Sequence, residues 1–251
     1  MKQNYWTYNK PLSVMGLGGG VASLSFKGAK EGSIEESGLD IYLDANDSNS
    51  YSGSGTTWTN LSTSGNFGNA ILKTSSGLNT YTSSGSPKYF TNLRAYIPLP
   101  VFRTVYYPLT YSIWVYPTEL SGYDTVIDQG NDNFFFGFDS AELITFDPTH
   151  TGIASGISTN TWYNFTVTHT LAANFKFYQD GVLKSTITDT SNSFSGNFYD
   201  WSFGAGGVSS NDDGDSEPFI GRVGAIMVYN RPLTATEVSS NYNALKSTYG
   251  H

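Results

Sequence analysis

The stretch Gly38-Leu39-Asp40-Ile41-Tyr42-Leu43-Asp44 decides the fold class, because apolar and polar side chains alternate along it. In an extended chain Leu39, Ile41 and Leu43 point to one side, and the residues between them point to the other. A strand of this kind buries one face against a second layer and leaves the other face more polar. The stretch therefore predicts a half-buried β-strand at the start of a domain covering residues 38–251.

Short segments with similar properties recur along the rest of the chain, between stretches rich in Gly, Ser, Asn and Pro. We expect strands at 57–61, 70–74, 88–91, 111–116, 125–128, 134–138, 143–146, 162–168, 175–179, 182–188, 201–204 and 219–229. Between 175–179 and 182–188 lies Asp180-Gly181, a dipeptide that favours the positive φ angles of a type I′ hairpin turn. So many short strands predict an all-β domain, an antiparallel β-sandwich of two stacked sheets.

One helix is expected near the end of the sequence. Thr234 and Glu237 have the spacing of a capping box, in which each side chain satisfies a free N–H of the first turn. Val238 and Tyr242 lie four residues apart, so they share one helical face that can pack on a sheet. These features predict a helix of about 12 residues over 235–246, near the average helix length.

The composition excludes several classes of function. The 13 Lys and Arg residues, in a chain of net charge −8, form no basic stripe, so nucleic acid is not an expected partner. The chain has no cysteine for a disulfide or thiolate site, and its three histidines lack the spacing of a zinc site. No apolar run approaches the ~20 residues of a membrane span. The glycine-rich residues 12–24 lack a cleavage site typical of a signal peptide.

Residues 1–37 differ from the rest of the sequence and are interpreted as an N-terminal arm or linker. Tyr5, Trp6 and Tyr8 precede a glycine run, and a polar, charged connector covers 27–37. Two interpretations of the aromatic cluster remain. It docks on a partner protein, or it forms an extra strand on the edge of the sandwich.

Six motifs follow one another in order over residues 38–250. They are Gly38–Ala45, Ser50–Ser62, Trp162–Val167, Phe177–Val182, Phe219–Thr234 and Asn241–Leu245. Together they resemble the laminin G-like, concanavalin A-like jelly-roll domains that are frequent in phage and large-virus structural proteins. The resemblance implies a jelly-roll sandwich. It implies less about function, because this architecture carries lectins, adhesion modules, glycanases and capsid or fibre proteins.

The resemblance and the arm together suggest a non-catalytic virion structural protein, such as a fibre, tail or capsid decoration protein. The arm would bind other virion structural proteins, and the sandwich would bind cell-surface glycans, as a monomer or a homo-oligomer. One alternative is a free, extracellular, lectin-like protein that binds glycans. A glycoside hydrolase is the third interpretation.

Carboxylate pairs are the residues on which the hydrolase interpretation depends, because retaining glycosidases need two carboxyl groups about 5 Å apart. Glu31 and Glu35 have a suitable spacing but lie in the connector, so we expect solvated surface there. Asp40 and Asp44 fall on one face of a strand with Tyr42 between them. We expect surface or loop-supporting carboxylates at these positions, and therefore no catalytic residue.

Two further groups are candidates for binding. Asp212, Asp213 and Asp215 lie in one loop, and the resemblance implies Ca²⁺ at such a rim, held by hard oxygen ligands; an ordinary acidic turn is the alternative. Tyr123, Tyr199 and Trp201 are candidates for an aromatic platform under a sugar, in competition with burial in the core.

Overall fold

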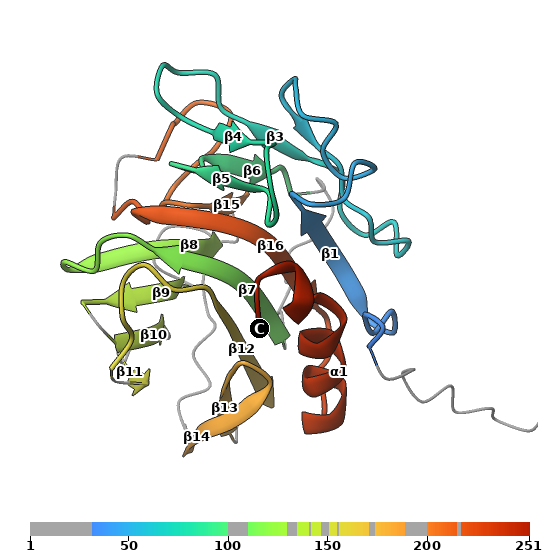
Figure 1. The fold of residues 1–251 in the computed structure, drawn as a ribbon, viewed down its shortest axis with the longest axis vertical. Helices are drawn as coiled ribbons and strands as arrows, with labels where there is room; N and C mark the ends of the chain where they lie inside the picture. Colours follow the sequence, from blue (N-terminus) through green and yellow to red (C-terminus); the bar gives the residue numbers. More distant parts are fainter. Residues whose placement is uncertain are drawn as a thin grey trace, which may run out of the picture.

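The computed structural model describes residues 32–99, 110–129, 135–140, 142–146, 151–154, 156–170, 174–188, 200–214 and 217–251. In this part of the chain two antiparallel sheets of eight strands each stack face to face, and one short helix lies near the C-terminus (Figure 1). The predicted all-β sandwich is therefore confirmed. None of the helices in these ranges combines the length and apolarity that crossing a membrane requires.

Sheet A has the strand order β14-β13-β12-β7-β16-β5-β4, with β1 also paired to β16. Its strands are β1 (Leu39–Asp44), β4 (Thr80–Thr82), β5 (Tyr89–Thr91), β7 (Thr110–Pro117), β12 (Tyr163–Thr170), β13 (Asn174–Gln179), β14 (Val182–Thr188) and β16 (Gly221–Tyr229). Sheet B has the order β11-β10-β9-β8-β15-β6-β3-β2. Its strands are β2 (Thr57–Trp58), β3 (Ala70–Leu72), β6 (Ala95–Ile97), β8 (Tyr123–Gln129), β9 (Phe135–Asp139), β10 (Glu142–Phe146), β11 (Thr151–Ala154) and β15 (Trp201–Phe203).

Each predicted strand overlaps an observed one, and β4, β6 and β11 are additional strands that the sequence did not predict. The hairpin turn is as expected, since Asp180 and Gly181 have φ angles of 53° and 74°. The helix α1 spans Ala235–Leu245, and its capping box of Thr234 and Glu237 is formed.

The alternation predicted for β1 is interrupted at its second residue. The register against β16 shifts between Leu39 and Ile41, which is a β-bulge centred on Asp40. As a result Ile41 and Leu43 face the core between the sheets, whereas Leu39 packs with a second cluster on the outer face of sheet A. The prediction that Leu39, Ile41 and Leu43 share one face is wrong at Leu39, because the bulge turns that side chain over.

Both faces of β16 are buried. Val223, Ile226 and Val228 lie in the core between the sheets. On the other face Met227 and Tyr229 pack against Val238 of α1, which lies over the outer face of sheet A (Figure 1). The apolar run of β16 is thus covered on one side by sheet B and on the other by the C-terminal helix.

Beside α1, residues 33–37 are fastened to the sandwich. The backbone N–H of Glu35 donates to the Asn241 side chain at 2.8 Å, and the Glu35 carbonyl accepts from the Tyr229 hydroxyl at 3.0 Å. The guanidinium of Arg231 lies 3.2 Å from the Glu35 carboxylate and 2.9 Å from that of Glu237. Glu35 was expected to be solvated, but it is only 9% exposed, because these partners replace water.

The loop 204–214 leaves the end of β15 and folds back over the outer face of sheet B. It starts at Gly204, where φ is +85° and an added Cβ would lie 2.0 Å from the carbonyl oxygen of Leu93. Gly207 has a similar φ of +72°, but an added Cβ there would meet no atom within 4 Å. Substitutions at the two glycines can therefore be compared. Both would strain the backbone, but only a side chain at Gly204 would overlap with neighbouring atoms.

We expect Gly204→Ala to destabilise the protein much more than Gly207→Ala. Both substitutions should lower the free energy of unfolding by about 1–2 kcal/mol, because each places a side chain at positive φ. Only Gly204→Ala adds overlap with the Leu93 backbone, about 1–3 kcal/mol more. Urea unfolding followed by tryptophan fluorescence measures both changes, and equal free energies of unfolding for the two variants would contradict the close approach at Gly204.

Candidate functional site

A row of side chains crosses the outer face of sheet B. The pairing register places Thr57 beside Ile71, Ile71 beside Tyr96, and Tyr96 beside Ser202. Asp128 on β8 continues the row beside Ser202. Because directly paired residues in antiparallel strands point to the same face, these side chains share the surface that faces away from the core.

The loop 204–214 covers the middle of this row. The Ser202 hydroxyl donates to the Val208 carbonyl at 2.8 Å, and the backbone N–H of Gly207 donates to the Asp128 carboxylate at 3.1 Å. Val208 and Ala205 pack against the ring of Tyr96. The loop therefore leaves open the part of the row that lies on β2 and β3, next to Tyr96.

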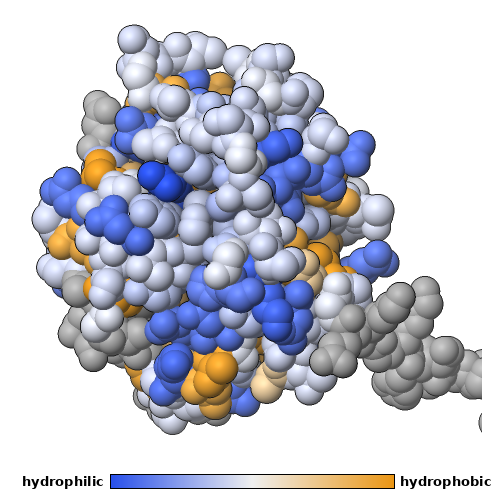
Figure 2. Space-filling model, in the orientation of Figure 1, coloured by the Kyte–Doolittle hydropathy of each residue, from blue (hydrophilic) through white to orange (hydrophobic). Residues whose placement is uncertain are grey.

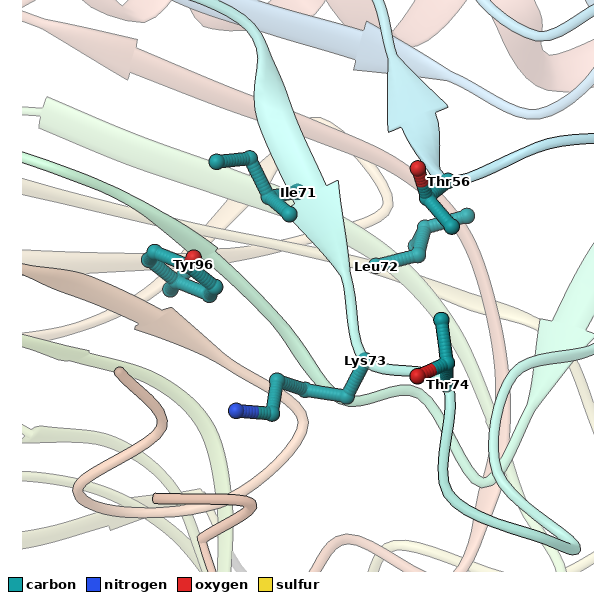
Figure 3. Close-up of a pocket in the computed structure, with 6 residues that line it drawn as sticks. All are labelled: Thr56, Ile71, Leu72, Lys73, Thr74 and Tyr96. Carbon is teal, nitrogen blue, oxygen red and sulfur yellow. The ribbon is translucent and has the colours of Figure 1, made fainter. Parts of the chain in front are cut away.

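This open part contains a cavity of about 220 Å³ (Figure 3). It is lined by Thr56, Ile71, Leu72, Lys73, Thr74 and Tyr96. Ile71 is 37% exposed, so part of its side chain is open to a ligand. Tyr96 is only 8% exposed, and its hydroxyl has no hydrogen-bond partner in the described chain. The cavity thus offers an apolar wall together with hydroxyl groups.

Lys73 closes the cavity on the side of the loop. Its ammonium group donates to the Ser209 carbonyl at 2.8 Å and lies 3.0 Å from the Asp213 carboxylate. It also lies 5.7 Å from the centre of the Tyr96 ring. Hydrogen bonds from Ser75 and Lys73 lower the pKa of the exposed Asp213 carboxyl. Lys73 therefore connects strand β3 to the loop and contributes a positive charge at the cavity.

The three aspartates considered for calcium are not placed together as free ligands in the described part of the loop. Asp213 pairs with Lys73, and Asp212 accepts the backbone N–H of Gly214 at 2.9 Å. Asp215 lies outside the described residues. Within those residues no group of three or more His, Cys, Asp or Glu side chains is arranged to hold a metal ion. The described side chains alone do not fit a calcium site, and calcium binding stays a prediction.

The predicted aromatic platform does not form from Tyr123 and Trp201. Tyr123 is 41% exposed and begins β8, whereas Trp201 is paired with Gln129 at the opposite end of that strand. Trp201 is fully buried in the core between the sheets, so its ring cannot stack on a ligand. Tyr199 lies outside the described residues, as do Tyr5, Trp6 and Tyr8.

The aspartates of β1 have structural partners. Asp40 accepts hydrogen bonds from the side-chain amides of Asn66 at 2.7 Å and Asn230 at 3.2 Å. Asp44 accepts from the Tyr42 hydroxyl at 3.0 Å and from the backbone of Asn46 at 2.8 Å. Burial raises the pKa of Asp44. Both aspartates support loops, as the sequence suggested, but neither is exposed.

Asp124 on β8 is a buried carboxyl group that the sequence did not single out. It is paired with Phe138, whose ring lies in the core, so its side chain also faces inward. One of its carboxyl oxygens is buried and has no hydrogen-bond partner among the described residues. Loss of solvation on burial, followed by the charge of Glu119, raises the pKa of Asp124 to about 7.

Comparison with known proteins gives one family match. The family described as the concanavalin A-like lectin/glucanases superfamily matches residues 90–239. A comparison with curated proteins found no match.

Several solved structures are similar in fold. One is domain 4 of AbnA, a GH43 extracellular arabinanase from Geobacillus stearothermophilus, in complex with arabinotriose. It is 19% identical to this chain, and the match covers 83% of this chain and 100% of that one, with a TM-score of 0.59. A structure of botulinum neurotoxin type C, whose cell entry depends on two ganglioside molecules, is 19% identical over 83% of this chain and 51% of that one, with a TM-score of 0.57. The sialidase of Trypanosoma rangeli, in complex with 2,3-difluorosialic acid, is 14% identical over 92% of this chain and 36% of that one, with a TM-score of 0.61. Thus the match spans about half of the neurotoxin chain and about a third of the sialidase.

The raised pKa of Asp124 predicts that stability falls as the pH rises. Between about pH 4, where an unfolded aspartate ionises, and pH 7, the native state holds a proton that the unfolded state has lost. The free energy of unfolding should therefore decline over this range and level off above pH 7.

Asp124→Asn should remove this decline, so that the variant is more stable than the wild type at pH 8 and similar to it at pH 4. Thermal melting at a series of pH values measures the difference, and Asp139→Asn on the neighbouring strand β9 is the control. A parallel pH dependence in wild type and Asp124→Asn would contradict the assignment.

Proposed function

Because the chain belongs to the concanavalin A-like lectin/glucanases superfamily, we propose that it is a non-catalytic carbohydrate-binding protein whose ligand site is the cavity beside Ile71, Lys73 and Tyr96. The observation that carries the proposal is an open cavity on the outer face of sheet B that combines an exposed apolar side chain with hydroxyl groups. A sugar ring presents the same combination, with C–H faces and a rim of hydroxyls.

The chemistry of the cavity supports a small polar ligand. Small-molecule sites join apolar or aromatic walls to a few polar groups that fix orientation. Here Ile71 supplies the apolar contact, while Thr56, Thr74 and Tyr96 supply hydroxyl groups. The volume of about 220 Å³ is below the ~300–1,000 Å³ of sites for drug-sized ligands, so the cavity suits one sugar residue of a longer glycan.

The proteins of similar fold also support binding to glycans. Their descriptions name arabinotriose, gangliosides and a sialic acid derivative. On the face shown in Figure 2 the hydrophobic residues form small separate patches among hydrophilic ones, which favours contacts with a polar ligand on this face over a broad apolar interface.

The surroundings of the buried carboxylates support a function without hydrolysis. Glu35 is paired with Arg231, and Asp40 and Asp44 are held by amide and hydroxyl groups. Asp128 accepts a backbone N–H of the loop that covers it, and Asp124 faces the core. Glycoside hydrolysis needs one carboxyl group as an acid and a second as a nucleophile or base, both open to the sugar.

We further propose that the protein is a structural component of a virion, such as a fibre, tail or capsid decoration protein. The resemblance of its motifs to phage and large-virus domains supports this role, together with the aromatic cluster of Tyr5, Trp6 and Tyr8 at the start of the sequence. In this arrangement the N-terminal arm binds other virion proteins and the sandwich faces the host. A free lectin-like protein is the alternative.

A bulky side chain in the cavity should block glycan binding without changing the fold. Thr74 is exposed at the rim, so Thr74→Trp should fill the space, and Thr63→Trp, at an exposed loop position outside the cavity, is the matched control. Tyr96→Phe removes only a hydroxyl group and should weaken binding about 2- to 10-fold, as the loss of one hydrogen bond does. A glycan array followed by calorimetry on the best ligand measures these effects.

Retained affinity in folded Thr74→Trp would place the ligand elsewhere. Release of reducing ends from arabinan or β-glucan by the wild type would contradict a non-catalytic role.

The virion role predicts that the protein co-purifies with particles. Mass spectrometry of particles purified from an infected host should detect it at a fixed ratio to the other structural proteins. Its recovery only as free protein in the lysate or medium would favour the lectin alternative.

A further inference from the structure

On the outer face of sheet A, one arginine is held between two tyrosine rings. The guanidinium carbon of Arg222 on β16 lies 4.3 Å from the ring centre of Tyr116 on β7 and 4.7 Å from that of Tyr89 on β5. Their neighbours Val223, Val115 and Phe90 are in the core, so these three side chains point away from sheet B. The guanidinium thus lies close to one tyrosine ring from each neighbouring strand.

The aromatic rings are themselves held in place. Trp162 packs against both, with ring centres 6.0 Å from Tyr89 and 5.5 Å from Tyr116. Trp162 is fixed in turn by Tyr249, at 4.8 Å between ring centres, and its carbonyl contacts the His251 ring at 3.1 Å. The aromatic contacts around Arg222 are therefore in place without a ligand, and such preorganisation lowers the entropy lost on binding.

Arg222 has no anionic partner in the described part of the chain. Of the three arginines there, Arg231 pairs with two glutamates and Arg94 donates to the backbone carbonyls of Gly204 and Gly214. Within the described residues Arg222 forms no ion pair or hydrogen bond, and none of its nitrogen atoms is buried without a partner. Its N–H groups consequently face solvent, although the chain carries a net charge of −8.

We propose that Arg222, clamped by Tyr89 and Tyr116, is a second binding site, which takes the carboxylate of an acidic sugar. A planar guanidinium donates two parallel hydrogen bonds to a carboxylate, and stacking between aromatic rings orients this fork. The site lies on the opposite face of the sandwich from the cavity of Tyr96. The inference deepens the proposed glycan-binding function and rests on it.

The groups around the guanidinium favour a sugar over an acidic peptide. The hydroxyls of Tyr89 and Tyr116 have no partner in the described chain and are not buried. Thr91, which is paired with Arg222 across the sheet, adds a third hydroxyl on the same face. A carboxylated sugar brings ring hydroxyls that can bond to these groups, whereas an aspartate or glutamate side chain brings the carboxylate alone.

The test compares 3′-sialyllactose, glucuronic acid and lactose as probes of the full chain. Wild type should bind the two acidic sugars at this site, and the Nε–H signal of Arg222 in the NMR spectrum should shift with them and not with lactose. Arg222→Met keeps the stacked methylene groups and should weaken acidic-sugar binding about 10- to 100-fold. Arg222→Lys keeps the positive charge but cannot donate two parallel hydrogen bonds, so it should lose most of the affinity for acidic sugars.

Lys184→Met removes one positive charge from an exposed position on β14 and should leave acidic-sugar binding unchanged. An unshifted Arg222 signal, or equal affinities in wild type and Arg222→Met, would overturn the second site. A hexaglutamate peptide that binds more tightly than either sugar would overturn it in favour of a protein partner. Thr74→Trp should block lactose binding, and Arg222→Met should leave it unaffected. This result would support the proposed function whether or not the second site is overturned.

Discussion

Burial of both faces of β16 is the constraint on which the rest of the structure depends. The strand carries an almost unbroken apolar run, so packing on sheet B satisfies only half of its side chains. Met227 and Tyr229 need a second cover, which α1 provides. Tyr229 brings a hydroxyl into that layer, and Glu35 and Asn241 satisfy it. The C-terminal helix and residues 33–37 are therefore integral parts of the sandwich, although a connector was predicted as far as residue 37.

The sequence predicted the sandwich well because alternation, turn dipeptides and the capping box are local signals. It was less informative where a local pattern is broken by pairing with a distant strand. The bulge at Asp40 turns Leu39 to the other face of sheet A, and only the register against β16 reveals it. Trp201 looked suitable for a sugar platform, yet β15 lies in the middle of sheet B, where its ring fills the core. The strands β4 and β6 are three residues each, too short for their period to be recognised.

The candidate sites were harder to predict than the fold, because their residues meet through cross-strand register. Ile71 and Tyr96 each sit within a short apolar run, and nothing in the sequence marks them as outward-facing. Asp213 was considered as a metal ligand, but its partner Lys73 follows β3 and lies 140 residues earlier in the sequence. Arg222 lies in the motif 219–234, and the sequence gives no reason for a basic residue there. Only the structure shows that Tyr89 and Tyr116 lie beside it. Composition did limit the chemistry, because with only 13 Lys and Arg residues an arginine without an ion pair among the described residues is conspicuous.

The fastening of residues 33–37 has a mechanical consequence. A pulling force applied at residue 32 acts on the Arg231 guanidinium and the Tyr229 hydroxyl before it acts on β1. Because β16 is paired on both edges and packed on both faces, we expect several strands to share this load.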